Sequence, residues 1–248
     1  AGTDSNKDQS YFLCQLSQQQ LSRALFPIGH LLKPEVRKIA SDLGLATADR
    51  KDSQGICFVG KVDLPVFLQQ KIKAIEGEIV EIPRAFYNSQ PTISPDDLEA
   101  LCKPIFYSKT DGLIVGRHHG AQFFTIGQRK GLNVGGKPEP LFVIATDVEQ
   151  NVVYVGMGDN HPGLYRKGLF ICQNDVHYIR PDLKLMPGQT ARLMVRIRYR
   201  QPLQKATLHS RDNGIYIIFD NPQRGVTAGQ FAAWYDNEEL IGSGVIAM

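Results

Sequence analysis

The spacing of apolar residues changes near residue 75, and the change divides the chain into a helical part and a β part. Before residue 75, apolar positions recur every three or four residues, as on one face of a helix. One short helix is predicted after Ser17, because Ser17 and Gln20 have the spacing of a capping box. A second is predicted from Pro34 to Gly44, since proline suits the first turn of a helix and glycine its end. A third is predicted to begin at Asp63.

From Gly77 onward, apolar and polar residues alternate, which is the period of a β-strand. A short helix at 94–101 interrupts this pattern. The predicted strands are 78–82, 113–115, 141–147, 152–155, 169–172, 191–200, 206–209, 215–219, 231–235 and 240–246. Many short strands separated by Gly, Pro, Asn and Asp favour small β-barrels over a parallel α/β sheet.

Together these patterns predict an α+β protein, in which a short helical segment is followed by two small antiparallel β-barrel-like domains. We assign the helical segment to residues 1–74, a central β domain to 75–160 and a C-terminal β-barrel to 161–248. The second boundary falls at residues 160–163, Asn-His-Pro-Gly, which are typical turn formers.

Composition and charge narrow the class of protein. The 248 residues are 42% hydrophobic, enough for an ordinary core, and they contain neither a long apolar run nor a secretory signal. We therefore expect a cytoplasmic protein without membrane contact. The net charge is +3 for residues 1–74, −4 for 75–160 and +4 for 161–248. Two basic ends permit binding of a polyanion such as nucleic acid, although such differences also arise by chance.

The segment 192–200 alternates arginine with apolar or aromatic residues and is the most informative predicted strand. One face would be buried (Leu193, Val195, Ile197 and Tyr199) and the other would present Arg192, Arg196, Arg198 and Arg200. Arginines two residues apart would stand about 6.6 Å from each other, near the spacing of successive phosphates on a nucleic acid strand. Pairing of these arginines with acids on a neighbouring strand is an equally good explanation.

Two short polar segments could also contact a nucleic acid. Lys7, Asp8 and Gln9 combine a cation, a carboxylate and an amide, and an amide can pair with a base edge while a lysine reaches a phosphate. Capping of the following helix by Asp8 or Ser10 explains this segment equally well. The turn 127–131, Gly-Gln-Arg-Lys-Gly, could hold a phosphate, but a solvated hairpin is the simpler explanation.

Cys57 lies in a glycine-flanked loop, with Arg50, Lys51 and Lys61 nearby in the sequence. Nearby cations stabilise the thiolate, the nucleophilic form of cysteine. Free cysteines are nonetheless among the most buried residues, so an inert core thiol is the general expectation, and it fits the other three better (Cys14, Cys102 and Cys172). The cysteines have no metal-ligand spacing, so neither a zinc site nor a disulfide framework is expected.

Six ordered segments, together spanning most of the chain, resemble the tRNA-specific 2-thiouridylase family. They are residues 4–12 (DSNKDQSYF), 25–29 (LFPIG), 33–40 (KPEVRKIA), 51–60 (KDSQGICFVG), 125–131 (TIGQRKG) and 198–201 (RYRQ). The resemblance implies transfer of sulfur to carbon 2 of the wobble uridine in tRNAs for Lys, Glu and Gln. ATP, together with Mg²⁺, would activate the C2 oxygen by adenylation, and a cysteine persulfide would deliver the sulfur. A sulfur donor protein, either a sulfur-relay protein or a cysteine desulfurase, would charge that cysteine.

The same resemblance gives roles to individual residues. Cys57 matches the family's persulfide-bearing cysteine. Two elements resemble the family's tRNA contacts, one formed by Lys7, Asp8 and Gln9 and the other by Arg198 and Tyr199. The second element would lie in a C-terminal barrel like those of translation elongation factors. Contacts from two separated elements would hold the anticodon loop while the target base is extruded.

The chain departs from the family's pattern in two places. The family begins with an ATP-binding domain that carries an SGGxDS phosphate loop and a second catalytic cysteine, and no SGGxDS segment occurs here. We therefore expect a fragment that binds tRNA but does not catalyse alone, and that has no cofactor-binding or metal-binding residue. Residues 83–110 form an insertion that contains Cys102 and could be a decoration or a partner surface.

Two other functions stay open on the sequence. The first is a non-catalytic RNA-binding module of the translation-factor barrel class, in which Cys57 is only structural. The second is a sulfur-relay or redox protein that uses Cys57 without any tRNA.

Overall fold

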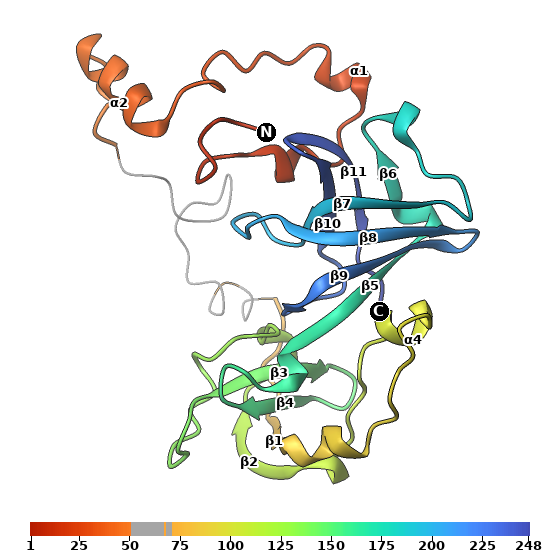
Figure 1. The fold of residues 1–248 in the computed structure, drawn as a ribbon. Helices are drawn as coiled ribbons and strands as arrows, with labels where there is room; N and C mark the ends of the chain where they lie inside the picture. The colour runs from red at the N-terminus through yellow and green to blue at the C-terminus, as the bar shows by residue number, and fades with distance from the viewer. Residues whose placement is uncertain (51–66, 68–70) are drawn as a thin grey trace. The chain divides into compact units, whose positions relative to one another are not determined.

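The structure, a computed structural model, describes residues 1–50, 67 and 71–248 (Figure 1). It divides into two compact units. Unit 1 comprises residues 1–61, 171–215 and 229–247, and unit 2 comprises residues 62–170, 216–228 and 248. The helix predicted at Asp63 lies outside the described residues, and the predicted domain boundaries at residues 74 and 160 stay predictions.

The N-terminal part of unit 1 contains three short helical elements: η1 (Ser10–Leu13), α1 (Gln18–Leu21) and α2 (Lys33–Asp42). The predicted capping box is confirmed, since the Ser17 hydroxyl accepts from the Gln20 N–H at 3.3 Å and the Gln20 side chain accepts from the Ser17 N–H at 2.8 Å. The helix predicted from Pro34 is also confirmed. It stops before Gly44, whose φ of 64° is the left-handed conformation that glycine adopts without strain.

Five strands of unit 1 form a continuous sheet in the order β8-β7-β10-β11-β6. Their bounds are β6 (Val176–Tyr178), β7 (Thr190–Arg196), β8 (Gln204–Arg211), β10 (Phe231–Asp236) and β11 (Glu239–Val245), with η6 (Gln173–Asp175) and η7 (Pro181–Leu183) between strands. The neighbouring strands in this order are antiparallel (β6 with β11, β7 with β8 and β10, and β10 with β11). Tyr11 and Cys14 pack on Ala233 and Tyr235 of β10, so the N-terminal segment completes the core of this sheet.

Unit 2 is built on a four-stranded sheet in the order β2-β1-β4-β3. Its strands are β1 (Gly77–Glu81), β2 (Leu113–His118), β3 (Leu141–Asp147) and β4 (Val152–Met157). The β1–β2 and β3–β4 pairs are antiparallel, whereas β1 and β4 run parallel. Two further strands, β5 (Tyr165–Cys172) and β9 (Gly214–Arg224), are neighbours.

Both faces of the four-stranded sheet are covered. Ile79 and Val153 contribute to one core cluster, and Val80 and Tyr154 contribute to the other. The insertion 83–110 supplies aromatic cover for the second face, because Phe86, Tyr87 and Tyr107 pack against it. Part of the insertion is therefore core. It contains η2 (Arg84–Ser89), α4 (Leu98–Cys102) and the start of η3 (Lys109–Asp111); η4 (Ala121–Phe123) and η5 (Pro162–Leu164) follow.

The α+β class and the barrel-like sheets predicted from the sequence are confirmed. All ten predicted strands are present, but β6 was not predicted, and β7 ends at Arg196 instead of continuing to residue 200. Among the described residues, no helix has the length and apolar character needed to cross a membrane.

Candidate nucleic-acid-binding site

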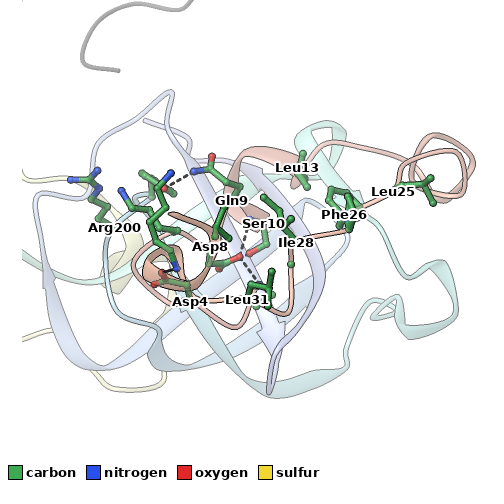
Figure 2. Close-up of a pocket in the computed structure, with 18 residues that line it drawn as sticks. Asp4, Asp8, Gln9, Ser10, Leu13, Leu25, Phe26, Ile28, Leu31 and Arg200 are labelled. Carbon is green, nitrogen blue, oxygen red and sulfur yellow. Dashed lines mark hydrogen bonds between the residues drawn. The ribbon is translucent and has the colours of Figure 1, made fainter. Parts of the chain in front are cut away.

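A cavity of about 820 Å³ opens in unit 1 between the N-terminal segment and the turn that follows β7 (Figure 2). Its walls come from two neighbouring N-terminal segments, within residues 1–13 and 25–36, and from two residues far along the chain, Tyr199 and Arg200. The lining residues are Ala1, Gly2, Asp4, Lys7, Asp8, Gln9, Ser10, Leu13, Leu25, Phe26, Pro27, Ile28, Gly29, Leu31, Lys33, Val36, Tyr199 and Arg200.

The N-terminal segment is fixed to the sheet by hydrogen bonds from η1. The Tyr11 hydroxyl donates to the carbonyl oxygens of Ile197, at 3.2 Å, and Phe231, at 2.9 Å. The Ser243 hydroxyl donates to the Cys14 carbonyl at 2.6 Å. Because both ends of η1 are bonded to strands or strand ends, the residues just before it are held in place.

Asp8 is a buried carboxylate, 5% exposed, among the residues that line the cavity. Its Oδ1 accepts from the N–H groups of Gly2 and Ser10, its Oδ2 accepts from the Ser10 hydroxyl, and Oδ2 lies 3.1 Å from Nη2 of Arg196. Burial raises the pKa of the Asp8 carboxyl, but the hydrogen bonds from Ser10 and Gly2 and the Arg196 charge outweigh it, so the pKa lies below its ordinary value. Asp8 is therefore a structural anion with its oxygens engaged.

Arg196 joins the two elements that the sequence singled out. Besides pairing with Asp8, it stacks over the Tyr235 ring at 4.8 Å from the centroid, and its Nη1 donates to the Tyr199 carbonyl at 3.5 Å. It is only 8% exposed. The prediction that Arg196 lies in an exposed row of arginines is thus wrong, because Asp8 and Tyr235 compensate for its burial.

The rest of the predicted arginine row also departs from a strand. Residues 197–200 form a bend and turn, so the alternation of faces stops at Arg196. In that turn Arg200 is exposed, Tyr199 is half-buried and Arg198 is half-buried beside it. Tyr199, predicted to lie on the buried face of a strand, instead lines the cavity.

Gln9 and Tyr199 meet although 190 residues separate them. The Gln9 side-chain amide donates to the Tyr199 hydroxyl at 2.7 Å. The Tyr199 ring also packs against Phe12, with ring centroids 4.6 Å apart. The structure therefore brings Lys7, Asp8 and Gln9 to the same cavity as Tyr199, while Arg198 is not among the residues that line it.

The cavity combines two kinds of surface. Leu25, Phe26 and Ile28 give it an exposed apolar wall, and Figure 2 shows these side chains on the side away from Arg200. Gln9, Tyr199 and the nearby cations form a polar edge. An unstacked base needs an apolar or aromatic surface and an amide or hydroxyl at its edge, and a nucleic acid strand needs cations for its phosphates. Sequence reasoning gave the apolar loop 25–29 no role of its own.

The predictions for the four cysteines have different outcomes. Cys57 lies outside the described residues. Cys14 and Cys102 are buried, as expected of inert core thiols, and burial raises the pKa of both, that of Cys102 to about 12. Cys172 is exposed, so the expectation that it is a core thiol is wrong.

The glycine-bounded turn at 127–131 uses part of its backbone internally. The Gly127 N–H donates to the Val143 carbonyl at 2.7 Å, and the Gln128 N–H donates to the Thr125 carbonyl at 2.9 Å. These two groups therefore do not serve a phosphate. Within the described ranges, no group of three or more His, Cys, Asp or Glu side chains is arranged to hold a metal ion.

Comparisons with known proteins match the chain along most of its length. Models of three families match successive parts: the tRNA methyl transferase HUP domain at residues 1–61, the tRNA methyl transferase PRC-barrel domain at 103–157 and the aminomethyltransferase beta-barrel domain at 170–246.

Three similar curated proteins carry one name, tRNA-specific 2-thiouridylase MnmA. The chain is 59% identical to that of Christiangramia forsetii, 58% to that of Flavobacterium johnsoniae and 47% to that of Karelsulcia muelleri. The alignments cover 100% of this chain and 64%, 64% and 63% of these relatives, so the chain spans a little less than two thirds of their length. The chain belongs to the tRNA-specific 2-thiouridylase family.

Proposed function

We propose that this chain holds tRNA and carries the sulfur in an enzyme that converts the wobble uridine of tRNA to 2-thiouridine. The observation that carries the proposal is the meeting of Lys7, Asp8 and Gln9 with Tyr199 at one cavity. The family resemblance suggested both elements as tRNA contacts, although they lie about 190 residues apart. Two such elements side by side form a continuous binding surface.

The contacts suggest different tasks for these residues. Lys7 at the cavity edge, and Arg198 beside Tyr199, supply positive charge for phosphates. The Gln9 amide and the Tyr199 hydroxyl, which already bond to each other, can exchange that bond for bonds to a base edge. Asp8 is buried and bonded on both oxygens, so its task is to hold Lys7 and Gln9 in position.

The sulfur step is assigned to Cys57. A persulfide on this cysteine would attack carbon 2 of the activated uridine with its outer sulfur, and the activated C2 oxygen would depart with its AMP. The bond between the two sulfurs must then be cleaved by a thiol, which is the role of the second catalytic cysteine in the family pattern. A sulfur-relay protein or a cysteine desulfurase would reload Cys57.

ATP supplies the adenylation of the C2 oxygen in this family pattern. The SGGxDS loop that would bind its phosphates does not occur among the residues of this chain, and the described residues offer no cluster of carboxylates for Mg²⁺. We therefore assign neither ATP nor Mg²⁺ to any residue here. The tRNAs for Lys, Glu and Gln are the proposed substrates, and the cytoplasm, where tRNA is modified, is the proposed compartment.

The test compares two single-atom changes in the complete protein. Tyr199→Phe removes the hydroxyl that Gln9 contacts, and Tyr165→Phe removes a hydroxyl that donates to the Asp159 carbonyl in unit 2. Tyr199→Phe should weaken binding of a substrate tRNA several-fold, and Tyr165→Phe should leave it unchanged. Equal affinities of wild type and Tyr199→Phe would overturn the assignment of this cavity to tRNA.

A second measurement separates the sulfur role from plain RNA binding. The complete protein is treated with a sulfur donor, and Cys57 is examined by mass spectrometry for the mass of one added sulfur. Its presence supports a persulfide carrier. Its absence, with tRNA binding intact, would favour a non-catalytic RNA-binding module.

A further inference from the structure

A second cavity, of about 390 Å³, lies in unit 2 and is lined entirely by residues between Arg129 and Leu141. This loop connects η4 to β3 and begins inside the glycine-bounded turn at 127–131. Its backbone takes the left-handed conformation at Gly131, Asn133 and Gly136, with φ of 87°, 52° and 73°. Left-handed residues placed between right-handed ones turn successive N–H groups to one side and make concavities that bind anions.

Most N–H groups of this loop are available. Apart from the N–H of Leu132, which follows the turn at residues 130–131, no backbone N–H from Arg129 to Lys137 donates a hydrogen bond to a protein acceptor among the described residues. This contrasts with Gly127 and Gln128 directly before the loop, whose N–H groups are both bonded. An anion seated in the loop would meet donors that the protein itself leaves to solvent.

The loop is also held in shape. Leu132 is buried in the core cluster on one face of the four-stranded sheet, and Val134 packs against the same cluster. The Gln128 side chain accepts from the Thr125 N–H at 3.1 Å and donates to the Lys130 carbonyl at 2.8 Å. A backbone fixed before binding loses little entropy when a ligand arrives.

Charge around the cavity favours an anion modestly. Arg129 lines it, Lys130 follows, both are exposed, and neither forms an ion pair with a described residue. Lys137 also lines the cavity but is 2.5 Å from a Glu81 carboxylate oxygen. Glu139 is the acidic lining residue. Three cations and two carboxylates leave a net positive charge, carried by Arg129 and Lys130.

We propose that this loop binds phosphate groups of the tRNA backbone, through its N–H groups and Arg129. The inference rests on the proposed function and adds a tRNA contact in unit 2 that is separate from the cavity of unit 1. A phosphodiester suits the site, because an extended strand can place one phosphate in a shallow cradle without burying the neighbouring nucleotides.

The experiment measures binding of a substrate tRNA to the complete protein at several salt concentrations. Arg129→Gln should lower the affinity about 3- to 10-fold and reduce the slope of log K against log salt by about 0.7 to 0.9, the value for one lost phosphate contact. The matched control is Arg117→Gln, which removes an exposed arginine of unit 2 paired with Glu76. Its affinity and slope should equal those of the wild type.

A second variant tests the backbone of the loop without changing an arginine. A Cβ at Gly135 would meet no atom within 4 Å, and the backbone there is not left-handed, so Gly135→Asp is compatible with the fold. Its carboxylate should repel a phosphate and weaken tRNA binding at least as much as Arg129→Gln. Wild-type affinity for tRNA in both variants would overturn the proposal.

Two further measurements distinguish a failure of this proposal from a failure of the proposed function. If inorganic phosphate shifts the amide resonances of Gly135 and Gly136 while Arg129→Gln binds tRNA like the wild type, the loop takes free phosphate and the assignment to tRNA is wrong. Tyr199→Phe is measured in the same series. Loss of affinity in Tyr199→Phe alone would refute this site and leave the proposed function standing, whereas a wild-type protein that binds no tRNA would refute the proposed function.

Discussion

The ion pair between Asp8 and Arg196 should be the most sensitive point of unit 1. Both side chains are almost fully buried, at 4% and 9% exposure, and the charged atoms are 3.1 Å apart. At an effective dielectric constant of about 20, two unit charges at that separation attract each other by about 5 kcal/mol before desolvation is counted. Removing one partner of a buried pair costs about 3–5 kcal/mol, because the other charge stays buried without compensation.

Asp8→Asn is the sharpest perturbation of this pair. Asparagine has the same shape and can still accept from the N–H groups of Gly2 and Ser10, but its own amide N–H would face the Arg196 guanidinium, donor against donor. We expect a loss of about 3 kcal/mol in the free energy of unfolding. For a chain of this size that loss corresponds to a fall in melting temperature of roughly 6–12 °C.

The assay is thermal and denaturant unfolding of a double-mutant cycle made of Asp8→Asn, Arg196→Met and the combined variant. The two changes should not add: the combined variant should be less destabilised than the sum of the single ones by at least about 1 kcal/mol. The matched control is Glu76→Gln, which breaks the exposed pair with Arg117 and should cost less than about 1 kcal/mol. Additive effects, or a loss in Asp8→Asn no larger than in the control, would refute the reasoning.

Four further outcomes are expected. The folded pKa of Asp8 lies below its unfolded value of about 3.8. The contribution of Asp8 to stability is therefore complete above pH 3.8 and is lost as the pH falls through the folded pKa. Acid-unfolding curves of wild type and Asp8→Asn should converge at low pH. Cys57→Ala in the complete protein should abolish 2-thiouridine in a mass-spectrometric nucleoside assay while tRNA binding persists; continued thiolation would contradict the persulfide role. Arg198→Ala should weaken tRNA binding with a shallower salt dependence, and an unchanged slope would remove this contact. Iodoacetamide near pH 8 should label exposed Cys172 and spare Cys102, whose pKa of about 12 keeps the thiol protonated; equal labelling would argue against the buried position of Cys102.

Local patterns predicted most of the secondary structure because local forces decide it. The capping box at Ser17 and the proline and glycine that bound α2 act within one or two turns, and the alternation of polar and apolar residues predicted ten strands. Strand β6 was not predicted because its three residues, Val176–Tyr178, are too few to show an alternating pattern. They are a strand because they pair with β11. The apolar side of α2 was visible in the sequence, yet Ile39 and Leu43 are exposed among the described residues.

The candidate site was only half predictable, for a physical reason. From Arg192 to Arg200 arginines alternate with apolar or aromatic residues except at Met194, but β7 ends at Arg196, whose side chain turns inward to Asp8 and Tyr235. No local signal reports a partner 188 positions away. The contact between Gln9 and Tyr199, which are 190 positions apart, has no local signal either, so the sequence could suggest both proposed tRNA contacts but not that they share a cavity.

The most direct test of the central claim is a double-mutant cycle on tRNA affinity in the complete protein, using Gln9→Ala, Tyr199→Phe and both together. If the two residues form one contact surface, each change lowers the affinity several-fold, and the combined variant binds hardly more weakly than the worse single one. Wild-type affinity in all three variants would contradict the claim that this cavity binds tRNA.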